Sequence, residues 1–201
     1  MRNNEQGRSM IEMLGVLAIV GVLSVGGIAG YSKAMNKFKA NKLIDQITMI
    51  STNVKTIFSG QRTYNGLNLS IAGKVGILPA ETFAANQVSS LNSANVTHAF
   101  SGYIDLEPSG LNNATDEGAY MLTITKIPSD ACVAVLTTDF GSDATVAYGT
   151  ADVTGTFQGN AGTANKIATP GGSAQSMPFS VVAAKTACGS ATDNTIYFKF
   201  K

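Results

Sequence analysis

Histidine is almost missing from the sequence: His98 is the only one among 201 residues. A zinc site built from histidines therefore cannot form within this chain alone. A lone histidine in a stretch rich in serine and threonine is far more often a surface residue than a general base, so we expect His98 at the surface. No glycine-rich phosphate loop precedes a helix either. We predict no catalytic, cofactor-binding or metal-binding residue, and an enzyme has little support.

Charged residues are scarce, at 13% of the chain, which is about half the usual share. Residues 1–60 carry seven Lys and Arg against three Asp and Glu, whereas residues 61–201 carry seven against ten. No basic block suits nucleic acid, so we predict no nucleic-acid partner. Asp139 and Asp143 could share a calcium ion, but the further oxygen ligands that calcium needs are not spaced around them.

One stretch has no charge at all: Met13–Ser32, twenty residues long. As a helix it would span about 30 Å, the thickness of a bilayer core. It is longer than the apolar core of a cleaved secretory signal, roughly 7–15 residues, and no Ala-x-Ala-like site ends it. We therefore expect it to cross a membrane. Glu12 lies at its edge, where a carboxylate held in hydrocarbon costs at least ~2–3 kcal/mol unless it reaches the headgroups or has a partner.

Gly7 is followed by Arg-Ser-Met-Ile-Glu-Met-Leu, so that a short polar leader ends in glycine and glutamate is the fifth residue after it. This arrangement resembles the processing site of type IV pilins and pseudopilins. The resemblance implies cleavage by a prepilin peptidase between Gly7 and Arg8. Arg8 departs from the Phe or Met that usually begins the mature chain and is often N-methylated.

The resemblance also implies a function. The chain would be a structural subunit of a type IV pilus, held in the bacterial inner membrane as a prepilin and then polymerised by the inner-membrane assembly machinery into an extracellular helical homopolymer. Glu12 would set the register by pairing with a cation, either the new α-amino group of Arg8 or the Arg8 guanidinium. Alternatively, Glu12 only aids recognition by the peptidase.

Two other functions remain open. Within the family, the chain could be a pseudopilin of a type II secretion-like system or a minor pilin. From a different class, it could be a signal-anchored extracytoplasmic binding protein, which would keep residues 1–7 and form no filament. Four lysines follow the apolar run, which by charge counting would place the C-terminal domain in the cytoplasm. The pilin resemblance implies the outside, and long domains can translocate regardless of flanking charge.

Cys132 and Cys188 are the only two cysteines. An even pair in a chain that is exported across a membrane indicates a disulfide bond. The alternative is a pair of unbonded buried thiols in a cytoplasmic domain.

The expected fold is α+β and type IV pilin-like: a long N-terminal helix packed on a C-terminal antiparallel sheet with one disulfide, closest in layout to the larger type IVb-like pilins. We expect a leader over 1–7, a helix over 8–60 whose residues 13–32 span the membrane or form the filament core, and a globular head over 61–201. Apolar residues at a period near 3.6 predict the second half of the helix; they are Met35, Phe38, Ile44, Ile47, Ile50, Val54, Ile57 and Phe58.

Within the head, residue patterns predict several elements. Alternating or β-branched runs predict strands over 100–107, 119–127 and 194–200. A short helix is predicted over 70–75, a second after Pro128-Ser129-Asp130, and a third over 180–188. Residues 111–118 are turn-like, and 140–176 are expected to be partly stranded.

Overall fold

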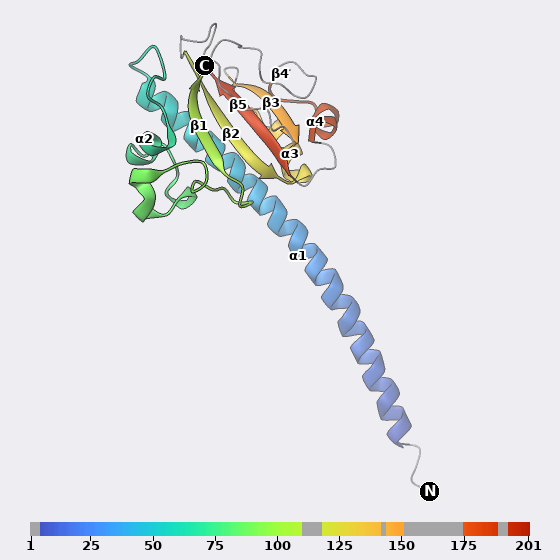
Figure 1. Ribbon diagram of the computed structural model, residues 1–201. Helices are drawn as coiled ribbons and strands as arrows, with labels where there is room; N and C mark the ends of the chain where they lie inside the picture. Colours follow the sequence, from blue (N-terminus) through green and yellow to red (C-terminus); the bar gives the residue numbers. More distant parts are fainter. Residues whose placement is uncertain (1–4, 110–117, 142–143, 151–174, 189–192) are drawn as a thin grey trace. The chain divides into compact units, whose positions relative to one another are not determined.

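The computed structural model describes residues 5–109, 118–141, 144–150, 175–188 and 193–201. It begins with one helix, α1 (Glu5–Phe58), of 54 residues. The chain divides into two compact units, residues 1–38 and residues 39–201, so that α1 contributes to both. The first unit contains the apolar part of α1. The second contains the rest of α1 and all the other elements (Figure 1).

In the second unit one face of α1 is buried at a spacing of three or four residues, as an amphipathic helix requires. The residues of this face are Ala40, Leu43, Ile47, Ile50, Val54 and Phe58. The predicted period is therefore confirmed in part. Phe38 and Ile57 are exposed instead, at 64% and 41%. The helix ends at Phe58, two residues before the predicted stop at Gly60.

Short helical segments fill the connection between α1 and the sheet: α2 (Leu69–Lys74), η1 (Ala80–Thr82) and η2 (Ala85–Ser90). The side chain of Asn68 accepts a hydrogen bond from the Ile71 amide and caps α2. The helix predicted over 70–75 therefore exists but begins one residue earlier. Gly76 turns the chain after α2 with φ of +78°, a left-handed conformation that glycine adopts without strain.

In the described residues of the second unit, five strands form one antiparallel sheet at its centre. The strands are β1 (Ile104–Ser109), β2 (Ala119–Ile127), β3 (Ala144–Thr150), β4 (Gln175–Ser176) and β5 (Asn194–Phe200), in the order β1-β2-β5-β3-β4. The predicted bounds of β2 and β5 are confirmed. The prediction of the first strand over 100–107 is wrong at both ends, because β1 begins at Ile104 and does not stop before Pro108. β1 continues through Pro108 to Ser109, which is possible because β1 is an edge strand and needs no donor on its free side.

The sheet packs on the second half of α1, and aromatic side chains take part in the contact. Tyr120 and Phe200 are paired across β2 and β5, and their rings stack with centroids 5.1 Å apart. The Tyr120 hydroxyl donates to the carbonyl oxygen of Ser51 in α1 at 3.4 Å. Phe198 and Ile196 continue the same face of β5 and are fully buried. The predicted α+β fold, with a long helix packed on an antiparallel sheet, is confirmed.

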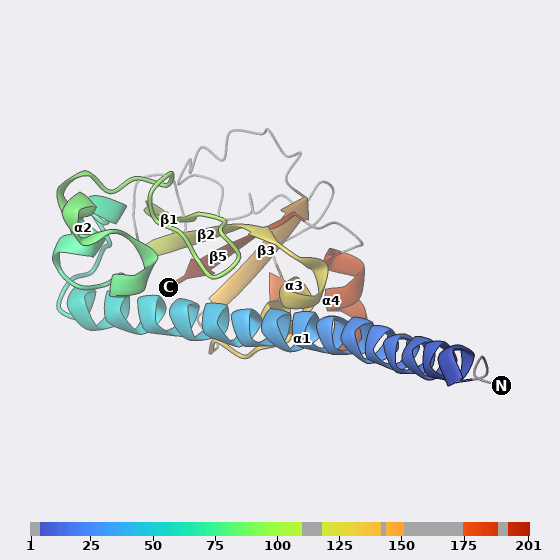
Figure 2. The ribbon, with the colours of Figure 1, turned by 90° about the horizontal axis from the view of Figure 1, so that it is seen from below.

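Two further helices, α3 (Ser129–Leu136) and α4 (Val181–Cys188), lie beside each other next to the sheet (Figure 2). Pro128 precedes α3, as predicted from the sequence. The predicted third short helix is α4. Of the stretch expected to be partly stranded, β3 and β4 are strands, and residues 142–143 and 151–174 lie outside the described residues. The predicted turn over 111–118 also falls there, apart from Gly118.

Candidate assembly site

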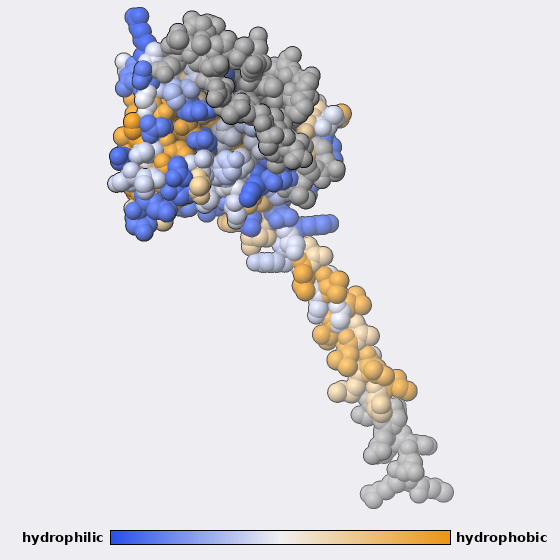
Figure 3. Space-filling model, viewed as in Figure 1, coloured by the Kyte–Doolittle hydropathy of each residue, from blue (hydrophilic) through white to orange (hydrophobic). Residues whose placement is uncertain are grey.

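The apolar part of α1 has no cover within its own unit. Among its large apolar side chains, exposed fractions range from 52% at Val20 to 75% at Val22, and Figure 3 shows this stretch coloured mainly orange. The described helix from Met10 to Phe58 is long and apolar enough to cross a membrane, with a mean hydropathy of 2.2 in its most apolar window. A surface of this kind in contact with water would be unfavourable. It therefore needs an apolar environment outside this unit.

The few polar groups in this stretch are satisfied within the helix. The hydroxyl of Ser24 donates to the carbonyl oxygen of Val20 at 2.7 Å, and that of Ser32 donates to the carbonyl oxygen of Ile28 at 3.0 Å. Backbone and hydroxyl groups that find partners inside one helix can enter hydrocarbon without a large penalty. These bonds make the segment compatible with an apolar environment.

Five glycines lie on the same stretch: Gly15, Gly21, Gly26, Gly27 and Gly30. A Cβ atom added at any of them would meet nothing within 4 Å. Packing inside this chain therefore does not require glycine there. Small residues on an apolar helix allow the backbones of neighbouring helices to approach closely. The glycines would therefore permit close packing against other helices.

Glu12 lies at the N-terminal end of the apolar stretch, between Met10 and Leu14, whose side chains are 68% and 63% exposed. The helix includes Gly7 and Arg8, so residues 8 and 12 are one turn apart and share a face. The side chains before Met10 are not described. The structure thus brings the three predicted processing and register residues, Gly7, Arg8 and Glu12, onto one helix end.

Cys132 and Cys188 form a disulfide bond, and the prediction is confirmed. The bond joins α3 to α4, with the Cα atoms 5.9 Å apart, and both residues are fully buried. It closes a loop with a sequence separation of 56 residues. On the chain-entropy model, closing a loop of that length stabilises a fold by roughly 4 kcal/mol.

His98 does not lie at the surface, and that prediction is wrong. Its side chain is 5% exposed, and both ring nitrogens contact the backbone. Nε2 is 2.7 Å from the carbonyl oxygen of Thr125, and Nδ1 accepts from the Phe100 amide at 3.2 Å. Because a carbonyl only accepts, Nε2 carries the proton and the ring is neutral. Burial lowers the pKa of His98, and the hydrogen bond to Thr125 opposes this only in part.

His98 occupies a place where β2 is irregular. The register with β5 shifts between Ile124 and Ile127, and Lys126 has φ of +56°. The shift leaves the Thr125 carbonyl to the imidazole instead of the strand ladder. Gly102 passes so close to Thr125 and His98 that a Cβ atom there would collide with both. The histidine is thus a structural part of the fold.

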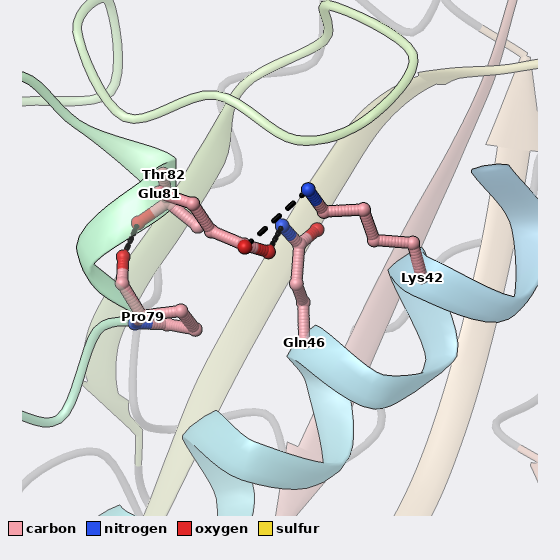
Figure 4. A network of polar contacts seen from close by, with 5 residues as sticks. All are labelled: Lys42, Gln46, Pro79, Glu81 and Thr82. Carbon is pink, nitrogen blue, oxygen red and sulfur yellow. Dashed lines mark hydrogen bonds and ion pairs between the residues drawn. The ribbon is translucent and has the colours of Figure 1, made fainter.

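A groove that the sequence did not predict lies between α1 and η1. It has a volume of about 510 Å³, and we call it the α1–η1 groove; its lining residues are Lys42, Asp45, Gln46, Met49, Pro79, Ala80 and Glu81. Figure 4 shows the polar contacts at its side. The Gln46 amide donates to Glu81 at 2.8 Å, and the Lys42 ammonium is 3.3 Å from the other carboxylate oxygen. The hydrogen bond from Gln46, together with Lys42, lowers the pKa of Glu81.

Among the described residues, no group of three or more His, Cys, Asp and Glu could hold a metal ion. Of the two residues weighed for calcium, Asp139 accepts a hydrogen bond from the Gly141 amide at 2.8 Å, and Asp143 lies outside the described residues.

Comparison with known proteins identifies the family to which the chain belongs. A family model described as Bundlin matches residues 32–201. The chain belongs to the Bundlin family. The match begins at Ser32, after the apolar run, so it does not depend on the processing motif around Gly7. The family is one of pilin structural subunits and not of enzymes, in agreement with the function expected from that motif.

Curated relatives and a solved structure agree with this assignment. The chain is 27% identical over 138 residues to the major structural subunit of bundle-forming pilus from Escherichia coli O127:H6 (strain E2348/69 / EPEC), and equally to that from Escherichia coli O111:H-. In each case the alignment covers 69% of this chain and 67% of the relative. TcpA, a type IV pilin from Vibrio cholerae El Tor biotype, shares the fold with a TM-score of 0.51 at 14% identity, over 81% of this chain and 99% of that one.

Proposed function

We propose that this member of the Bundlin family is a structural subunit of a type IV pilus. Its subunits polymerise into an extracellular filament, and no catalytic activity is involved. The observation that carries the proposal is the exposed apolar stretch of α1, attached to a unit that matches the Bundlin model. A helix with apolar side chains on all faces is stable only in lipid or among other helices. A subunit that moves from membrane to filament uses both environments.

We further propose how the chain is processed. Residues 1–7 form a leader that a prepilin peptidase removes between Gly7 and Arg8. In the mature chain α1 then runs from residue 8 to Phe58, and residues 13–32 anchor it in the bacterial inner membrane before assembly and form the filament core afterwards. Residues 61–201 form the head. The inner-membrane assembly machinery is the partner that moves the subunit from one state to the other.

Glu12 and the new N-terminus set the register in this proposal. Bundling of apolar helices places Glu12 in a dry core, where an unpaired carboxylate would be costly. Cleavage after Gly7 creates an α-amino group on Arg8, and the Arg8 guanidinium is a second cation at the same place. Pairing between Glu12 of one subunit and a cation of the next favours one axial offset, since other offsets leave a charge in hydrocarbon.

The N-terminus of sheared surface filaments tests the proposal. Mass spectrometry should find a chain that begins at Arg8. Gly7→Val should keep the leader and abolish filaments, because the peptidase requires a small residue before the cut. Gly7→Ala is the matched control and should be processed. Residues 1–7 still present on assembled material would contradict the processing scheme, and an uncleaved chain that forms no filament would indicate a membrane-anchored binding protein instead.

A further inference from the structure

Helix α4 carries an apolar surface that nothing in the described structure covers. Val181 and Val182 are 68% and 77% exposed, more than any other large apolar side chain described in residues 39–201. Lys185 lies one turn later, is also exposed, and has no hydrogen-bond or ion-pair partner among the described residues. We call these three residues the α4 ridge. Exposed apolar side chains that adjoin one another and are rimmed by polar residues can form a protein contact surface.

The α1–η1 groove has the complementary chemistry. Met49, Pro79 and Ala80 supply apolar lining, and Met49 is 51% exposed. Lys42 and Glu81 already form an ion pair with each other. That leaves Asp45, an exposed carboxylate with no ion-pair or hydrogen-bond partner in the described part of the chain. The remaining charge of the groove, on Asp45, is negative, whereas the charge of the α4 ridge, on Lys185, is positive.

The spacing of these groups matches as well. Asp45 and Met49 are four residues apart on α1, and Val181 and Lys185 are four residues apart on α4. Side chains four residues apart on a helix are neighbours about 5–6 Å apart. Two helices that cross in opposite directions can therefore place Lys185 on Asp45 and the valines on Met49 at the same time. Flexible methionine adapts well to such a contact.

The two surfaces lie on different sides of the second unit. The Thr97 amide donates to the carbonyl oxygen of Thr82 in η1, and Thr97 bridges Tyr103 just before β1, so η1 is tied to the β1 edge. Helix α4 contacts β3, beyond β5 in the sheet. Figures 1 and 2 agree in placing α2 beyond β1 and α4 beyond β3. One copy therefore cannot fill its own groove with its own ridge.

We propose that the α4 ridge of one copy docks into the α1–η1 groove of a second copy. This proposal rests on the proposed pilus function and identifies, within it, a contact between the heads of two subunits. A contact between two different patches leaves one of each free on every pair, so it continues indefinitely unless a ring closes. That is the kind of contact a filament needs. Buried apolar anchors hold the contact, and the Asp45–Lys185 pair fixes its direction.

Exchanging the two charges is the main test, with filament yield from cells that produce the full chain as the readout. Asp45→Lys and Lys185→Asp should each lower the yield by about tenfold or more, because each places like charges together. The double variant should return the yield to within about twofold of wild type. Lys201→Glu, an exposed reversal elsewhere, is the control and should have no effect. Single reversals that assemble normally, or a double variant no better than the singles, would overturn the contact.

Cross-linking gives a second readout that does not depend on yield. With Met49→Cys and Val182→Cys in one chain, oxidised filaments should contain subunits covalently linked in series. Val75→Cys with Val182→Cys is the control, since Val75 is 47% exposed on the same side of the unit but outside the groove. Equal linkage in both pairs would refute the proposal. Wild-type chains that form no filament at all would instead refute the pilus function, which separates the two failures.

Discussion

At the scale of single residues, His98 makes stability depend on pH. Its pKa in the folded chain is lowered from 6.5, mainly by burial, so the unfolded chain binds the proton more tightly. The stability that the neutral ring contributes is therefore fully present above pH 6.5 and is lost as the pH falls from there through the folded pKa. Protonation also converts Nδ1 into a donor, which breaks its bond from the Phe100 amide.

We predict that the free energy of unfolding of the detergent-solubilised chain falls between about pH 7.5 and about pH 5.5. His98→Gln should remove most of this slope, since glutamine does not titrate. It should also cost about 1–3 kcal/mol at the higher pH, because the Phe100 amide loses its acceptor. Urea unfolding at several pH values measures both effects. An unchanged slope in the variant would assign the pH dependence to the carboxylates instead.

A second residue, Asn68, has a local structural role that its sequence context does not indicate. Asn68 begins an Asn-Leu-Ser triplet that matches a glycosylation acceptor, yet its side chain caps α2. Asn68→Ala should lower the free energy of unfolding by about 1 kcal/mol, because the Ile71 amide loses its acceptor. Asn68→Asp should keep most of the stability, since aspartate is an equally good cap. Thermal unfolding of the two variants, measured side by side, tests this prediction. Equal losses of stability in both variants would argue against capping by Asn68.

At the scale of elements, the disulfide fixes α4 to α3. Removing it with Cys132→Ser and Cys188→Ser together should lower the free energy of unfolding by roughly 4 kcal/mol, because the unfolded chain regains the entropy of an open loop. The α4 ridge should then be displaced, so filament yield should also fall. Urea unfolding and filament yield are the two measurements. Thr186→Ser, a mild change on the exposed side of α4, serves as the control.

Elements whose pattern is local could be predicted from the sequence. Strands β2 and β5 combine β-branched and aromatic residues at alternating positions, and both were found with the predicted bounds. The two cysteines were paired correctly on the basis of export. The predicted end of β1 was wrong because the sequence does not say which strand lies at the edge, where Pro108 is tolerated.

Features that depend on distant residues could not be predicted. Buried His98 forms a hydrogen bond with a carbonyl 27 residues away, and Gln46 forms one with Glu81 across 35 residues. The pattern of neighbouring residues in the sequence does not predict contacts between such distant residues. The exposed valines of α4 gave no signal either, since a helix of that sequence could equally be buried. The processing and register residues Gly7, Arg8 and Glu12 stay predictions from their motif.

At the scale of the whole molecule, the role that we propose for Glu12 connects processing to assembly. Before assembly it lies at the edge of the apolar stretch, next to side chains that suit lipid. In a filament the same stretch would be surrounded by other helices, and in our proposal the carboxylate pairs with the cation at residue 8 of a neighbouring subunit. One charge per subunit would then specify the offset between subunits, while the glycines of α1 would let the helices come close.

Glu12→Gln separates this role from recognition by the peptidase. Glutamine has nearly the same shape but no charge, so the leader should still be removed and mass spectrometry should find Arg8 as the first residue. Filament yield should fall by about tenfold or more, because the cation at residue 8 loses its partner and no offset is favoured over the others. Glu12→Asp, which keeps the charge on a shorter side chain, should retain part of the yield. If cleaved Glu12→Gln chains build filaments as well as wild type, the charge pair does not set the register, and Glu12 acts before assembly only.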